Sequence, residues 1–133
     1  MSALRNKIQT NSAEDFIRRK NEYFKENNII KVKDISRKGY HVWVRESWTF
    51  MPQFNLDEKV FVIERLRREG YEGQTEGQKQ WGKGDIEYRF GYYVVGKIGR
   101  AKGRWVWGQF CPFIPAEDLK NLLRKAEKEG TIL

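Results

Sequence analysis

The chain has 133 residues, the length of one ordinary domain, and we expect residues 1–133 to form a single domain with its own core. Aromatic residues make up 14% of the composition, which argues against an intrinsically disordered chain. The formal net charge of +8 favours an acidic partner, with nucleic acid ahead of an anionic membrane surface.

The counts of cysteine and histidine exclude two further classes of protein. Cys111 is the only cysteine, so no intramolecular disulfide can form, and with His41 as the only histidine no Cys/His zinc finger can be built. The first residues lack the apolar run of a signal peptide, and no segment approaches the roughly 20 apolar residues of a transmembrane helix. We therefore expect a cytoplasmic protein with no membrane insertion, no metal and no other cofactor.

The first half of the chain predicts a helix, a hairpin and a second helix. Residues 11–28 carry apolar side chains at helical spacing, with Ser12 as the N-cap. Residues 29–36 and 40–50, rich in β-branched and aromatic side chains, predict two strands joined by a turn. Residues 55–70 predict a helix, because apolar residues recur there at helical spacing and a glycine follows them. That apolar stripe consists of Leu56, Val60, Ile63 and Leu66.

The second half predicts a loop, a second hairpin and a third helix. Residues 71–85 are polar and glycine-rich, which is typical of a flexible loop. Residues 86–98 and 104–110 predict a long hairpin across a glycine- and lysine-containing turn. Residues 115–130 begin with acidic and end with basic side chains, the order that suits a helix dipole.

The two hairpins resemble each other at an offset of 64 residues. Lys33, Lys38, Gly39, Val42 and Trp43 match the residues 97, 102, 103, 106 and 107 in type. This match predicts a ββα duplication with units 29–70 and 86–130, although convergence on similar hairpin chemistry explains five identities equally well. The expected fold class is α+β in the order α-ββ-α-ββ-α, with a mainly antiparallel four-stranded sheet and helices packed on one face.

The positive charge is concentrated in the two hairpins. Residues 29–50 hold five Lys/Arg and two Asp/Glu, and residues 86–110 hold five and one, so the hairpins carry +3 and +4 of the total +8. This segregation favours a basic binding surface over a randomly basic protein. The residues expected to contact phosphates are Arg37, Lys38, Lys97, Arg100, Lys102 and Arg104.

Tryptophans on the second strand of each hairpin suggest how bases would be bound. Side chains two apart share a strand face, so Trp43 lies with His41 and Arg45, and Trp107 lies with Trp105. Flat rings on an open sheet can stack bases while nearby cations, Arg45 among them, hold phosphates. The alternative is that these tryptophans fill the core, because tryptophan is highly buried on average.

The leading hypothesis is a non-enzymatic nucleic-acid-binding protein, for DNA or RNA, and two other classes stay open. The first is a small metal-dependent nuclease that uses Asp85 and Glu87 on one strand face. The second is a protein–protein interaction module with exposed aromatic side chains as its interface. His41 is expected to be a polar strand residue and Cys111 a small buried thiol rather than a nucleophile.

Overall fold

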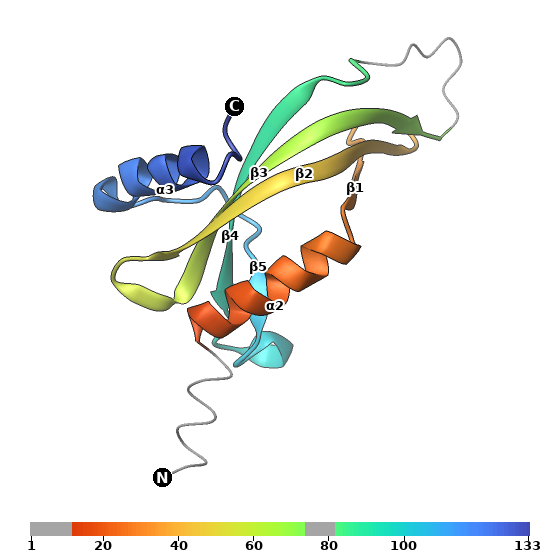
Figure 1. The fold of residues 1–133 in the computed structure, drawn as a ribbon. Helices are drawn as coiled ribbons and strands as arrows, with labels where there is room; N and C mark the ends of the chain where they lie inside the picture. The colour runs from red at the N-terminus through yellow and green to blue at the C-terminus, as the bar shows by residue number, and fades with distance from the viewer. Residues whose placement is uncertain (1–11, 74–81) are drawn as a thin grey trace.

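The computed structural model describes residues 12–73 and 82–133 and has an α+β fold, as expected. Five antiparallel strands pair in chain order, and two α-helices flank this sheet at either end of the described chain (Figure 1). The elements are α2 (Ala13–Glu26), β1 (Ile29–Lys33), β2 (Tyr40–Gln53), β3 (Leu56–Glu72), β4 (Ile86–Val95), the single 3-10 turn η1 (Gly99–Ala101), β5 (Trp105–Trp107) and α3 (Ala116–Lys128).

The helix expected over residues 55–70 is wrong, because these residues form β3, the central strand of the sheet. Residues 60–64 of β3 are buried without interruption. A strand covered on both faces reads as a continuous apolar run, which helical spacing also fits over a short window. Val60, Val62 and Ile63 are β-branched, and β-branched residues favour a strand over a helix. A two-residue turn at positions 54 and 55 then connects β2 directly to β3.

The loss of that helix removes the predicted ββα repeat. In the described part of the chain, the order of elements becomes a helix, five strands and a helix. Residues 29–70 continue from a hairpin into a third strand, so they share no unit with residues 86–130. The predicted loop over 71–85 is also shorter than expected, because β3 extends to Glu72. Its middle, residues 74–81, lies outside the described residues.

The helices pack on opposite faces of the sheet, which corrects the expectation that both cover one face. Phe16 and Phe24 of α2 pack with Phe50, Val60, Val62 and Tyr93. Leu122 and Ala126 of α3 pack with Phe61 and Ile63, which alternate with the first set along β3. We call these the α2 face and the α3 face. The burial of β3 on both faces follows from this arrangement.

Irregular pairing between β2 and β3 bends the sheet where the two longest strands run side by side. Their register shifts between Val42 and Trp43, between Arg45 and Ser47, and between Pro52 and Gln53. Such bulges increase the local twist of a strand and re-aim the side chains beyond them. As a result β2 presents Phe50 and Trp48 toward α2 at one end and Arg45 and Trp43 toward the same face at the other.

Candidate nucleic-acid interface

Trp43 and Trp107 share one face of the sheet, but it is the α2 face rather than the open, helix-free face that was expected. Trp43 pairs across the strands with Arg68, and Trp107 pairs with the core residue Tyr93. Paired residues in an antiparallel sheet share a face. The structure therefore brings to one face two tryptophans from strands that are not neighbours in the sheet.

The Trp107 ring lies across β4 at Gly91. A Cβ at position 91 would come within 2.2 Å of Trp107 Cη2, so a glycine is what lets the ring lie there. The Arg89 guanidinium lies over the ring at 4.9 Å from its centroid, and Tyr93 meets it edge-on at 5.0 Å. Trp107 is still 38% exposed, so a large part of this aromatic surface is open to a ligand.

Trp43 is the half-buried counterpart at the other end of the face. The Arg68 guanidinium lies 4.5 Å from its ring centroid, in cation–π contact. Arg68 also donates to Glu87 Oε1 at 3.0 Å and lies 3.1 Å from His41 Nδ1. Trp43 and Trp107 thus each carry an arginine over the ring. We call Trp43, Arg68, Arg89 and Trp107 the tryptophan–arginine strip.

A polar chain fixes His41 beside the strip. Arginine can only donate, so His41 Nδ1 accepts from Arg68, and Nε2 carries the proton that it donates to Asp34 Oδ2 at 3.1 Å. The pKa of Asp34 lies below its usual value, chiefly because the Ser36 backbone N–H donates to its carboxylate. Both ring nitrogens of His41 are occupied, which favours a structural role over that of a general base.

Arg45, expected among the nucleic-acid contacts, is instead buried beneath the face. Its guanidinium lies 3.5 Å from the Phe24 ring centroid and donates to Glu64 Oε1 at 2.8 Å. Glu64 is fully buried and also accepts from Arg89 at 2.6 Å and 3.1 Å. Glu64 therefore holds Arg89 against Trp107, and Arg45 supports the site from inside the protein.

Two residues of α2 extend the site, although the sequence analysis did not select them. Lys20 Nζ lies 4.9 Å from the Tyr93 ring centroid and 4.9 Å from that of Tyr23, which is largely exposed. Burial lowers the pKa of Lys20, and the charge of Arg45 lowers it further. Lys20 and Tyr23 line a cavity of about 220 Å³ with Phe16 and Arg19. A cation in aromatic surroundings therefore lies on the α2 face beside Tyr93.

The predicted phosphate contacts form two groups at opposite ends of the sheet. Arg37 and Lys38 lie in the β1–β2 turn, whereas residues 97–104 connect β4 to β5 at the far end (Figure 1). The 17 residues of β3 run between these ends, about 55 Å along the strand. Arg37 lies near Asp34 and Lys97 is paired with Glu58, while the side chains of Lys38, Arg100, Lys102 and Arg104 are exposed.

Of the two carboxylates of the alternative nuclease site, that of Glu87 is engaged in an ion pair. Glu87 is bonded to Arg68, and the Asp85 backbone closes the turn with Gly82. Among residues 12–73 and 82–133, no three His, Cys, Asp or Glu side chains gather closely enough to hold a metal ion. Cys111 is exposed rather than buried, because the segment after β5 leaves the sheet before α3 begins.

Comparison with known proteins identifies no family for this chain. No protein-family model, no curated protein and no solved structure matches the chain. Among the helices that the structure describes, none is long and apolar enough to cross a membrane. The function is therefore argued from the geometry and the charge of the site.

Proposed function

We propose that this chain binds a single-stranded nucleic acid across its α2 face and catalyses no reaction. The observation that carries this proposal is the pair of tryptophans on one face, each with an arginine over its ring. Aromatic rings stack bases regardless of sequence, and each stacked base contributes about 1–3 kcal/mol. A single strand is proposed because its bases are free to leave their neighbours and stack on protein.

The spacing of the two rings suits several nucleotides. Trp107 lies at Gly91 and Trp43 at the level of Arg68, whose N–H donates to Asp85 O. Six residues of β4 therefore separate the two levels, about 20 Å at roughly 3.3 Å per residue. A strand that keeps the rise of about 3.4 Å per nucleotide found in B-DNA would cover this distance in about six nucleotides, within the range of about 4–16 known for single-strand-binding folds.

The distribution of charge suggests that the middle of the α2 face and its two ends contact different parts of the nucleic acid. Arg68 is paired with Glu87. The buried Glu64 is shared between Arg89 and Arg45, so one positive charge of this group is not balanced. The strip therefore offers its ring and guanidinium planes together with a single excess positive charge. The exposed cations Lys38, Arg100 and Lys102 lie beyond it at the two ends. We expect bases to stack on the strip and phosphates to be neutralised at the ends.

Fluorescence anisotropy with labelled oligonucleotides tests the proposal. Single-stranded DNA and RNA of about 15 nucleotides and the matching duplexes are titrated with wild type and with Trp107→Ala. Loss of one stacked base weakens single-strand binding about 5- to 150-fold. Phe54→Ala, which removes an exposed aromatic ring from the β2–β3 turn, is the matched control and leaves affinity unchanged. Equal affinity of wild type and Trp107→Ala, or no single-strand binding at low salt, would refute it.

The salt dependence of binding tests the charged end separately. Each phosphate of a single strand that the protein no longer neutralises flattens the slope of log affinity against log salt by about 0.7. The double variant Arg100→Glu/Lys102→Glu removes two such cations and should therefore lower the slope by about 1.4. An unchanged slope would remove this end from the binding surface even if the tryptophan result stands.

A further inference from the structure

Within residues 12–73 and 82–133, the outer edge of β4 is left without a partner over five residues. β5 pairs only with residues 93–95, and the Gly108 N–H then donates to Tyr92 O at 2.8 Å. At the start of β4, the backbone carbonyl of Asp85 accepts from the Arg68 N–H, so the backbone groups of Asp85 point toward β3. Because backbone groups alternate along a strand, Ile86, Tyr88 and Phe90 point their N–H and C=O groups outward. No strand in the described part of the chain pairs with them.

The side chains of this edge are complementary to a second copy of themselves. Its sequence Ile-Glu-Tyr-Arg-Phe places apolar residues on the α3 face and the two charges on the α2 face. If it is read antiparallel to itself with Tyr88 at the centre, Ile86 meets Phe90 and Glu87 meets Arg89. Ile86, Tyr88 and Phe90 are 37%, 38% and 40% exposed, an unusual exposure for three successive apolar positions of one strand face.

We propose that this protein forms a symmetric dimer in which the β4 edges of two copies pair antiparallel, with Tyr88 opposite the partner's Tyr88. Ile86 and the partner's Phe90 form a hydrogen-bonded pair, which exchanges two N–H···O bonds, as does the central tyrosine pair. Glu87 faces the partner's Arg89 across the axis. The arrangement is isologous, so every contact occurs twice.

The opposite edge of the sheet shows why β4 is the edge used. On β1, Asn28 O and the Asp34 N–H bond toward β2, so Ile29, Lys31 and Lys33 point their backbone groups outward. Two of these three residues are lysines, which natural sheets use to prevent pairing at an edge. The β4 edge lacks that protection, since its outward-pointing residues are all apolar or aromatic.

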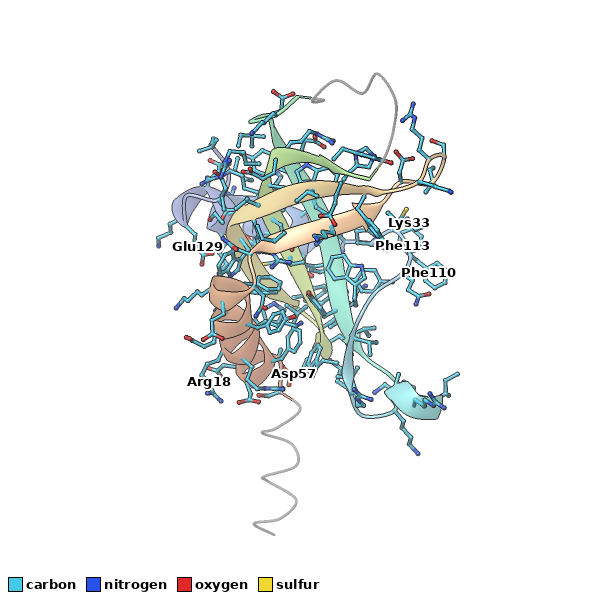
Figure 2. All side chains as sticks on the ribbon, turned by 90° about the vertical axis from the view of Figure 1, so that its right-hand side faces the viewer. Arg18, Lys33, Asp57, Phe110, Phe113 and Glu129 are labelled. Carbon is cyan, nitrogen blue, oxygen red and sulfur yellow. The ribbon has the colours of Figure 1, made fainter. Side chains whose placement is uncertain are left out.

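Apolar surface beside the β4 edge enlarges the contact. A stable interface buries about 800 Å² per partner, more than five edge residues offer by themselves. Leu133 is largely exposed and donates its backbone N–H to Tyr88 Oη at 2.9 Å. Phe110, two residues beyond Gly108, is 81% exposed and lies on the other side of the view from α2 (Figure 2). Both side chains would be shielded from water by a second copy.

The dimer would place the α2 faces of both copies on the same side of one continuous ten-stranded sheet, because the two-fold axis runs perpendicular to the sheet. This inference is independent of the proposed function, since it rests on the β4 edge and is measured without nucleic acid.

Sedimentation equilibrium of the full chain measures the dimer directly. The wild type should approach twice the monomer mass of 15.9 kDa as its concentration rises. Tyr88→Pro removes an outward N–H without breaking a bond to β3 and should return the protein to a monomer. Lys31→Pro makes the same change on the β1 edge and should leave the dimer intact. A monomeric wild type at all concentrations, or a dimer unaffected by Tyr88→Pro, would overturn the proposal.

Cysteine cross-linking tests the register and does not depend on how proline is tolerated. In a Cys111→Ser background, Tyr88→Cys places two thiols on the axis, where Cα atoms about 5.5 Å apart allow a disulfide. Ile86→Cys is the matched control, because that side chain is equally exposed but lies four residues from its own copy along the paired strands. We expect oxidation to cross-link Tyr88→Cys and not Ile86→Cys. Cross-linking of Ile86→Cys and not of Tyr88→Cys would refute the register that places Tyr88 on the axis. Hydrogen-exchange protection of this edge in a monomer would show that something other than a second copy covers it.

Discussion

A substitution at Gly91 tests whether the Trp107 ring lies on β4 as described. Gly91→Ala introduces a Cβ that would lie 2.2 Å from Trp107 Cη2, and ordinary contact begins near 3.4 Å, so the ring must move by at least 1.2 Å. Gly91 has no positive φ, so alanine fits its backbone and by itself stabilises the protein by about 0.4–1 kcal/mol. Overpacking costs about 1–3 kcal/mol, which leaves a net loss of up to about 2.6 kcal/mol.

Urea denaturation of a double-mutant cycle separates these two effects. In a Trp107→Ala background the steric conflict is gone, and Gly91→Ala should then stabilise by the full 0.4–1 kcal/mol or so. The expected coupling between the two positions is therefore about 1–3 kcal/mol. Single-strand affinity of Gly91→Ala should fall as well, because the displaced ring no longer meets the base in the same place. Additive effects, within about 0.5 kcal/mol, would refute the placement of the ring.

Three further predictions concern the support of the site. Trp105→Ala should cost about 3–5 kcal/mol of stability in urea denaturation, because Trp105 is stacked on Phe16 in the core, yet the folded fraction should keep its affinity. Glu64→Ala should cost about 3–5 kcal/mol, because two arginines lose their buried partner, whereas the control Glu87→Ala, at an exposed ion pair, should cost less than about 1 kcal/mol. Burial raises the pKa of Tyr93 to about 12, so the phenol ionises more easily in the unfolded chain. The free energy of unfolding should therefore fall as pH rises from about 10 to about 12. Thermal melts at alkaline pH should show a smaller fall for Tyr93→Phe.

The sequence predicted the outer elements well and failed at the centre of the sheet. The expected N-cap of the first helix is confirmed, since the Asp15 N–H donates to Ser12 Oγ at 3.1 Å. The two hairpins also lie where they were expected, with β5 shorter than predicted. Strand β3 was mistaken for a helix because packing on both faces removes the two-residue alternation that identifies a half-exposed strand. The packing of α3 against the second face of β3 depends on tertiary structure, which the local sequence pattern does not reveal.

Because β3 was expected to be a helix, most contacts of the candidate site could not be predicted from the sequence. Alternation along β2 placed Trp43 beside His41 and Arg45, and the supposed repeat placed Trp107 with Trp43. The repeat is wrong, but the register of the strands does put both tryptophans on one face. Arg68 could not be recognised as the partner of Trp43, because residues 55–70 were expected to form a helix rather than a strand beside β2. Arg89 could have been found, because Glu87, Arg89, Gly91 and Tyr93 alternate along β4 on the face that carries Trp107. The burial of Arg45 depends on Glu64, 19 residues away, and only the register of β2 against β3 reveals it.

Trp105 and Trp107 have different surroundings because α2 covers only part of the face. The two side chains point the same way from β5, but Phe16 of α2 stacks on Trp105 at 4.4 Å between ring centroids. Trp107 instead meets Tyr93 and Arg89, outside the part of β5 that Phe16 covers, and keeps more than a third of its surface exposed. Burial of an indole stabilises the fold only where a hydrophobic partner closes over it. Stability therefore depends chiefly on Trp105, while Trp107 remains free to meet a ligand, and this division is the reason to expect opposite outcomes from Trp105→Ala and Trp107→Ala.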